Sequence, residues 1–226
     1  MICAAHQPNY MPWLGFFNKI HMCDIFVLMD CVQYPRRQVV NRNRIKTPQG
    51  WTWLTVPVSL NKKISIPIRE VLVDNSQDWG ATTWKSIVHN YKKAGNFDRY
   101  SGFIEDMFHR RWDHLAEVNE HFIRFIVSEF DIETKLVRES DLEGVAGTGS
   151  ERLVSICKAV GSDEYLSGDG SAGYLEPQLF EENGIGLSYQ GFEHPRYRQM
   201  WGGFLPNMSI VDLILNEGEK SVEYVR

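Results

Sequence analysis

Three hydrogen-bonding side chains, His6, Gln7 and Asn9, follow a short apolar run at residues 2–5. A histidine can accept or release a proton near neutral pH, and amide groups can donate hydrogen bonds to an oxygen on which charge develops. Two prolines in the same loop lower the entropic cost of holding these groups in place. The pattern predicts a base and its polarising donors in one turn. The alternative, that His6 and Asn9 only cap the next helix and hold the loop, stays open.

A second cluster is the one dense basic stretch in a chain with 24 Lys+Arg, 29 Asp+Glu and a net charge of −5. Guanidinium groups bind phosphate through paired hydrogen bonds, and Trp51 and Trp53 nearby could stack on a base or a sugar ring. A solvated basic loop is the alternative. The negative net charge and the absence of an RNA- or DNA-binding signature disfavour nucleic acid as a partner. The substrate-binding residues predicted here are Gln33, Tyr34, Arg36, Arg37, Arg42, Asn43 and Arg44.

Other polar residues follow predicted strands and would meet His6 at one edge of a sheet. Asp30 ends the apolar run 24–30, and Ser167 and Asp169 follow a short strand at 165–167. A carboxylate there could orient a histidine or bind sugar hydroxyls, although an ordinary turn explains the residues equally well. His194 follows another predicted strand and would join the same rim. A glycine-rich stretch, 144–149, precedes a helix, where it could form an anion nest or, as we favour, a simple cap.

The elements that must position these residues alternate between strand and helix. Apolar runs predict strands near residues 2–5 and 24–30. Residues 133–138, 165–167 and 185–192 also read as strands, with further β structure at 51–58 and 64–74 and a polar, turn-rich segment at 31–50. Helical spacing dominates residues 79–130 and recurs at 14–20, 150–160, 174–183 and 209–216. We therefore expect one α/β domain spanning 1–226, with a mostly parallel, Rossmann-like sheet and a helical segment, about 79–130, inserted between its halves.

Composition excludes several classes of protein. A hydrophobic content of 43% and a charged content of 23% are typical of a globular chain, not of a disordered one. Four cysteines without a CxxC pair suggest reduced thiols and a cytoplasmic location. No apolar run approaches the roughly 20 residues of a membrane span, so we expect no membrane insertion. The histidines of the helical segment lack metal-ligand spacing, and no metal site is predicted.

A long motif in the first third of the chain resembles the opening of the WbqC-like family. It reads HQPNYxPWLGFFxKI from His6 to Ile20, and it continues with residues 24–34, 41–46 and 51–58. Shorter matches follow at 156–158, 165–168, 192–195 and 206–209. The resemblance implies a role in surface-polysaccharide (O-antigen) biosynthesis and, as an activity, transfer of glycine or another acyl group to an amino sugar. Within this motif Trp13 is a further predicted substrate-binding residue.

A weaker resemblance, to nucleotidyltransferase-like α/β enzymes, concerns the His-bearing loop after the first strand. Those enzymes hold the phosphates of a nucleotide with an HxGH motif. This chain has His6 but no second histidine in that frame, with Asn9 and Trp13 nearby instead. The departure argues against adenylyl transfer but leaves nucleotide binding open.

The leading hypothesis is an enzyme that transfers a small acyl or aminoacyl group to the amine of a nucleotide-linked amino sugar. His6 would be the base and Gln7 and Asn9 the polarising donors, with Asp30 facing the same cleft. The alternatives are an accessory protein that binds a nucleotide sugar without chemistry, and an ATP-dependent ligase. The sequence specifies neither the acyl donor nor any cofactor, and it leaves the oligomeric state open, a homo-oligomer included.

Overall fold

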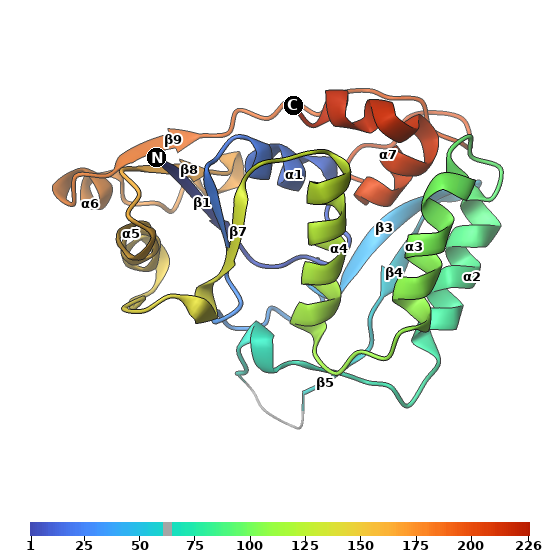
Figure 1. The fold of residues 1–226 in the computed structure, drawn as a ribbon, viewed down its shortest axis with the longest axis horizontal. Helices are drawn as coiled ribbons and strands as arrows, with labels where there is room; N and C mark the ends of the chain where they lie inside the picture. The colour runs from blue at the N-terminus through green and yellow to red at the C-terminus, as the bar shows by residue number, and fades with distance from the viewer. Residues whose placement is uncertain (61–64) are drawn as a thin grey trace.

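A five-stranded parallel sheet forms the centre of the protein, as seen in a computed structural model that describes residues 1–60 and 65–226 (Figure 1). Its strand order is β7-β2-β1-β8-β9. The strands are β1 (Ile2–His6), β2 (Ile25–Leu28), β7 (Lys135–Arg138), β8 (Glu164–Ser167) and β9 (Gly186–Tyr189). All four pairings in this sheet are parallel, so the predicted Rossmann-like α/β fold is confirmed.

The order of the strands sets the place at which a ligand site is expected. From β1 the chain builds outward through β2 to β7 and then crosses back to place β8 on the other side of β1. Loops that follow β1 and β8 therefore diverge in opposite directions. Open α/β sheets bind ligands in the crevice at such a switch point, outside the carboxyl ends of the strands.

Helices cover both faces of the sheet, as the alternation of side chains along β1 shows. Cys3 and Ala5 join the core cluster beneath α5 (Gly149–Val160) and α6 (Pro177–Glu182). Ala4 points to the opposite face and joins the larger cluster. That cluster also holds residues of α1 (Leu14–His21) and α4 (Leu115–Glu129). In Figure 1 α5 and α4 accordingly lie on opposite sides of the strands.

The helical segment expected at 79–130 consists of three helices, α2 (Trp79–Tyr91), α3 (Phe97–His109) and α4. It follows β2 and precedes β7 in the chain, and its apolar side chains share one core cluster with the sheet. The approach of α2 to α3 is close, since a Cβ on Gly80 would lie 2.0 Å from the carbonyl oxygen of Phe108. A larger residue at position 80 would push these two helices apart.

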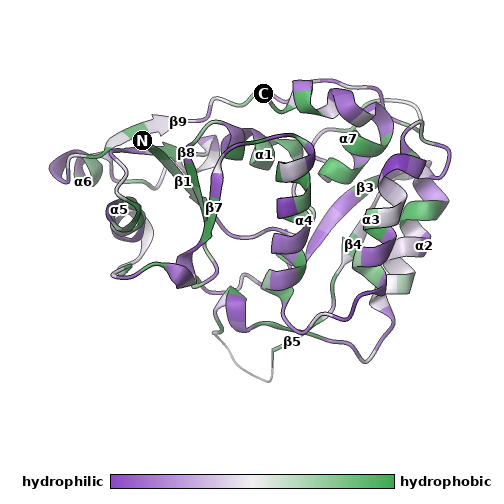
Figure 2. Ribbon diagram, in the orientation of Figure 1, coloured by the Kyte–Doolittle hydropathy of each residue, from purple (hydrophilic) through white to green (hydrophobic). Residues whose placement is uncertain are grey.

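Two small antiparallel hairpins precede the helical segment. One pairs β3 (Arg42–Thr47) with β4 (Gly50–Thr55), and the other pairs β5 (Val58–Ser59) with β6 (Leu72–Val73). The segment expected to be polar and turn-rich, 31–50, also holds a strand that the sequence did not predict, because β3 lies within that range. Its sequence is polar, and Figure 2 shows β3 in purple where β1 is green. Pairing with β4, rather than apolar alternation, defines this strand. The strand predicted at 64–74 begins outside the described residues.

A buried carboxylate fastens the C-terminal part of the chain to the helical segment. Asp212, on α7 (Ile210–Glu217), is fully buried. It accepts hydrogen bonds from the hydroxyls of Tyr91 at 2.6 Å and Tyr197 at 2.8 Å, and from the amide of Gln199 at 2.8 Å. Burial raises the pKa of this carboxyl, while the three donors oppose the shift. The network joins α2, α7 and the loop at 191–207.

No helix in the described part of the chain combines the length and the apolar character that crossing a bilayer requires. The longest of these helices, α4, has 15 residues, whereas a span needs about 20.

Candidate functional site

A pocket of about 700 Å³ opens at the carboxyl edge of the sheet, at the switch point. Its walls come from the ends of β1 and β8, the segment after β2, the first turn of α5 and the short helix η3 (Asp169–Ser171). Four predicted site residues line it: His6, Gln7, Gln33 and Ser167. The volume falls in the range of pockets that hold small molecules.

His6 is the last residue of β1, which places its half-buried ring at the pocket wall. Its Nδ1 lies 2.9 Å from the carbonyl oxygen of Gln7 and its ring packs edge-on against Phe16. Since a carbonyl only accepts hydrogen bonds, Nδ1 carries the proton and Nε2 keeps a free electron pair. Burial, helped by the positive charge of Lys19, lowers the pKa of His6 to about 4. The imidazole is therefore neutral at physiological pH.

The two amides of the motif lie in different environments. Gln7 lines the pocket, and its side chain makes no hydrogen bond within the described residues, so its amide can turn to a ligand. Asn9 is buried away from the pocket lining, and its Oδ1 has no hydrogen-bond partner in the described residues. The structure thus brings Gln7, but not Asn9, to the site of His6.

A positively charged residue that the sequence did not single out lies beside His6. Lys19 extends from α1 with only 5% of its surface exposed, and its Nζ donates to the carbonyl oxygen of Ala5 at 3.0 Å. It lines the same pocket. Burial lowers its pKa to about 8, an effect that Cys23 and Cys3 partly oppose. Lys19 belongs to the motif that runs from His6 to Ile20, but its position within a helix is typical of a solvated lysine, so the sequence assigned it no role.

Asp30, expected to face the cleft, is instead buried and bonded to the backbone beyond β7. Its two carboxylate oxygens accept from the backbone N–H and the hydroxyl of Ser140, at 3.0 and 2.7 Å. It does not line the pocket. The physical reason is that a carboxylate at a strand end can satisfy itself on neighbouring donors within the protein. Asp30 therefore positions the segment after β7, where η2 (Glu139–Asp141) lies.

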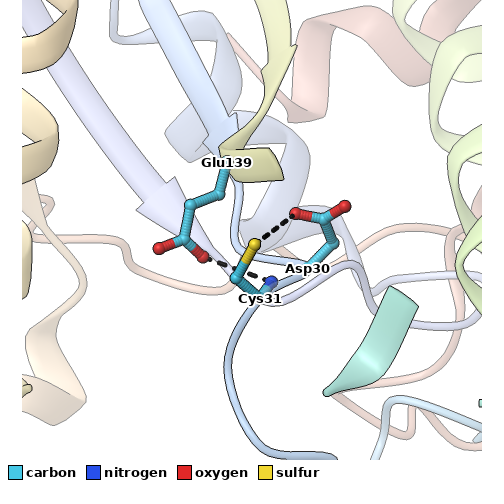
Figure 3. A group of neighbouring side chains, drawn as sticks. All are labelled: Asp30, Cys31 and Glu139. Carbon is cyan, nitrogen blue, oxygen red and sulfur yellow. Dashed lines mark hydrogen bonds between the residues drawn. The ribbon is translucent and has the colours of Figure 1, made fainter. Parts of the chain in front are cut away.

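Next to Asp30, Cys31 and Glu139 complete a group whose ligand atoms lie within 4.8 Å of one another (Figure 3). The ligand atoms of Glu139 and Cys31 already accept hydrogen bonds from arginines. Arg152 donates from Nε to Glu139 at 2.5 Å, and Arg69 donates to the sulfur of Cys31 at 2.8 Å. Two guanidinium groups against three ligands oppose a divalent cation, so we assign no metal here. Burial and the nearby carboxylates raise the pKa of Cys31, which keeps the thiol protonated.

The turn after β8 contributes one of its two predicted residues. Ser167 is buried, lines the pocket and hydrogen-bonds the hydroxyl of Ser171. Asp169 instead accepts from the backbone N–H groups of Gly191 at 2.8 Å and Phe192 at 3.0 Å. This carboxylate links the loop after β8 to the loop after β9, as a turn residue does, and is not part of the lining.

The basic stretch lies on the β3–β4 hairpin and the turn before it, not in the pocket lining. Arg42 stacks on Trp53 with its Cζ 4.3 Å from the ring centre, and Arg44 lies 5.2 Å from the centre of Trp51. Both indoles are exposed. In Figure 1 this hairpin and α5 lie on opposite sides of α4. The substrate-binding role predicted for these arginines stays a prediction, and they would exert it on the hairpin face.

Neighbours of these arginines serve the structure of the loop. Asn43 is buried and donates to the carbonyl oxygens of Tyr10 and Met11, at 3.3 and 2.8 Å. Tyr34 is buried, which raises its pKa, while Arg36 and Arg37 are exposed in the turn that follows. Of the predicted site residues that follow β2, Gln33 therefore lines the pocket, whereas those after it do not.

Trp13 and His194 meet in an aromatic cluster outside the pocket lining. Their rings are stacked with centres 6.0 Å apart, and Phe192 packs edge-on against Trp13. Both nitrogens of His194 are engaged: Nδ1 lies 2.8 Å from the carbonyl oxygen of Pro195, and Nε2 accepts from the N–H of Asn207 at 3.1 Å. The cluster anchors the loop after β9 to the start of α1.

Further pocket residues come from the glycine-rich stretch before α5, which we had interpreted as a simple cap. Thr148 occupies the N-cap position but makes no side-chain capping bond. It lines the pocket with Gly149 and Arg152. The sequence signal for these residues was the run of glycines ahead of a helix, which lacks the spacing of a P-loop.

The strand order and a pocket at the switch point define a Rossmann-like α/β protein with a ligand site at the carboxyl edge of its sheet. The chain belongs to the WbqC-like protein family, whose model matches residues 7–224. It is 35% identical over 225 residues to "Uncharacterized protein Rv1507c" of Mycobacterium tuberculosis (strain ATCC 25618 / H37Rv), covering 99% of this chain and 96% of that protein. No solved structure matches the chain.

Proposed function

We propose that this protein is an enzyme of surface-polysaccharide (O-antigen) biosynthesis. It transfers a small acyl or aminoacyl group, such as glycyl, to the amine of a nucleotide-linked amino sugar. The observation that carries the proposal is a neutral histidine, His6, at the wall of a small-molecule pocket, whose Nε2 has no hydrogen-bond partner in the described residues. The family resemblance suggests the substrate class, and the residues of the pocket suggest how the reaction would proceed.

His6 acts in one step of this reaction, the transfer of the proton that the amine loses. The amine nitrogen bonds to the carbonyl carbon of the donor, and the bond from that carbon to the leaving group breaks. The proton that the amine loses passes to Nε2 of His6 and from there to the leaving group. The side-chain amide of Gln7, without a partner in the described residues, can donate to the oxyanion that forms on the carbonyl.

The low pKa of His6 shapes this step. A pKa of about 4 keeps the ring neutral and able to accept a proton, but it also makes the ring a weak base. The charge of Lys19 contributes to the lowering, after burial. A substrate anion bound beside Lys19 would offset that charge, and so would raise the pKa of His6 once the substrate is bound.

A direct assay tests the proposal. Purified protein is incubated with UDP- or dTDP-linked amino sugars and each donor class in turn: an acyl thioester, a carrier-bound aminoacyl group, or an amino acid with ATP. We expect a mass gain on the sugar equal to the acyl group. Binding without product would favour the accessory role, and product with AMP release would favour a ligase.

The test of His6 uses a matched control. We expect His6→Ala to lower turnover by about 100-fold or more, because general base catalysis contributes 10²–10⁴-fold. His89 is exposed on α2 and distant in sequence from the pocket residues, and His89→Ala should retain activity. Full activity in His6→Ala would remove this histidine from the mechanism.

A further inference from the structure

The charges at the pocket are all of one sign. Among the described residues that line it there are two cations, Lys19 and Arg152, and no aspartate or glutamate. They lie at the wall of a cavity whose low-dielectric surroundings strengthen charge interactions. A pocket with this lining attracts an anion.

Of the two cations, Lys19 gives the stronger evidence for a bound anion. Its Nζ donates one hydrogen bond, to Ala5, and no carboxylate in the described part of the chain forms an ion pair with it. Two of its three N–H donors make no hydrogen bond in the described residues, and the remaining contact of the ammonium is with the Tyr165 ring, whose centre lies 5.9 Å from Nζ, although only 5% of Lys19 is exposed. A buried charge without a counter-ion destabilises a fold, and such groups persist where a ligand supplies the opposite charge.

The N-terminus of α5 faces the same pocket. This helix has 12 residues, and its first N–H groups lack acceptors within the helix. The side chain of Thr148, the N-cap, makes no capping hydrogen bond to them. Gly147 and Gly149 have φ of 82° and 52°, a left-handed conformation that turns the chain into the helix. The acidic residue of the first turn, Glu151, is exposed and outside the lining.

Arg152 is held in place from two sides. Its Nε donates to the buried carboxylate of Glu139 at 2.5 Å, and its Nη1 donates to the carbonyl oxygen of Gly147 at 3.2 Å. Its Nη2 has no partner among the described residues. A guanidinium fixed along one edge and free along the other is prepared to bind phosphate oxygens.

We propose that Lys19, Arg152 and the N-terminus of α5 form a subsite for a phosphate or pyrophosphate group. In the proposed function, on which this identification of the ligand rests, the group is the diphosphate of the nucleotide-linked sugar. The subsite lies in the pocket of His6, so it would hold the sugar within reach of the base. It replaces the hairpin arginines, Arg42 and Arg44, as the principal phosphate contacts.

Calorimetric titration tests the subsite without any assay of turnover. The probes are inorganic pyrophosphate, UDP and uridine, added to the full chain. We expect the two phosphate compounds to bind and uridine to bind at least 10-fold more weakly. Equal binding of UDP and uridine, or no binding of pyrophosphate, would overturn the proposal.

Variants locate the binding. Lys19→Met should weaken UDP about 10- to 100-fold, as expected for loss of one charge-assisted contact. Lys158→Met, which removes a lysine from the exposed far end of α5, should leave binding unchanged. Because Arg152 also neutralises Glu139, it is tested as the double variant Arg152→Gln/Glu139→Gln, with the same loss expected. A loss in Arg44→Gln and none in Lys19→Met would instead place the phosphates on the hairpin.

The experiments distinguish a failure of the phosphate subsite from a failure of the proposed function. UDP binding that depends on Lys19, together with no acyl transfer from any of the donors to the amino sugar, would uphold the subsite and refute the proposed function. Acyl transfer that persists at full rate in Lys19→Met, with unchanged UDP affinity, would uphold the function and refute the subsite.

Discussion

Replacing Lys19 by methionine should make this protein more stable, even though it removes a residue that we place in the binding pocket. The substitution keeps most of the side-chain volume and removes a charge that is 5% exposed and has no carboxylate partner in the described residues. Functional sites retain such unfavourable groups because the ligand, not the fold, requires them.

The size of the effect follows from the protonation equilibrium of Lys19. An unfolded lysine has a pKa of 10.5, and burial lowers the folded value to about 8. At about 1.4 kcal/mol per pH unit, the folded state loses about 3 kcal/mol at pH 7 by keeping this amine charged. The variant also loses the hydrogen bond to Ala5, about 1 kcal/mol. The net gain is about 2 kcal/mol, or roughly 4–8 °C in Tm for a chain of this length.

The pH dependence separates this cause from better packing. The folded pKa lies below the unfolded one, so the penalty is fully present below pH 8 and is relieved as the pH rises from about 8 to 10.5. Urea unfolding of both proteins at intervals from pH 6 to 10.5 should show the advantage of Lys19→Met shrinking over that range. An advantage that stays constant with pH, or a variant less stable than the parent at pH 7, would refute the reasoning.

Three further predictions concern the base, the buried network and the helix packing. Once an activity is established, kcat/KM should fall on the acid side with a midpoint near pH 4, because burial and Lys19 lower the pKa of His6 to about 4. A midpoint near pH 6.5 would contradict this assignment of the base. Asp212→Leu should lower the unfolding free energy by about 3 kcal/mol in urea titrations, because three buried donors lose their acceptor. Gly80→Ala should destabilise the protein by more than 2 kcal/mol, since its Cβ would meet the carbonyl of Phe108 at 2.0 Å. Gly102→Ala, also in a helix but with nothing within 4 Å, should stabilise it by about 0.5–1 kcal/mol by thermal melting.

The first two strands of the sheet, β1 and β2, were predictable because they are short apolar runs that end in polar turns. β3 was not, since its residues are mostly polar and only its partner β4 makes it a strand. Local sequence shows which residues are apolar, but it does not show which distant segment will pair with a polar one. The helical segment was predictable from its spacing for the opposite reason, because helix hydrogen bonds are local.

At the site, the residues next to strand ends were the predictable ones. His6, Gln7 and Ser167 reach the pocket because the carboxyl ends of parallel strands meet at one edge. Lys19 could not be found this way, since it reaches the pocket by extending a long side chain from within a helix. The density of arginines at 36–44 gives no information on which face of the molecule they occupy, and their substrate-binding role stays a prediction.

A contact between α1 and Val225 constrains how the chain folds as it is synthesised. Asn18, on the first helix, donates its side-chain amide to the backbone carbonyl of Val225 at 2.8 Å, across 207 positions. The central strand β1 likewise pairs with β8, which is made only after residue 164. During translation the His6 loop and α1 therefore remain without their final partners until residue 225 has emerged. The site can be assembled only late, and a chain that stops short of residue 225 would leave α1 incompletely anchored.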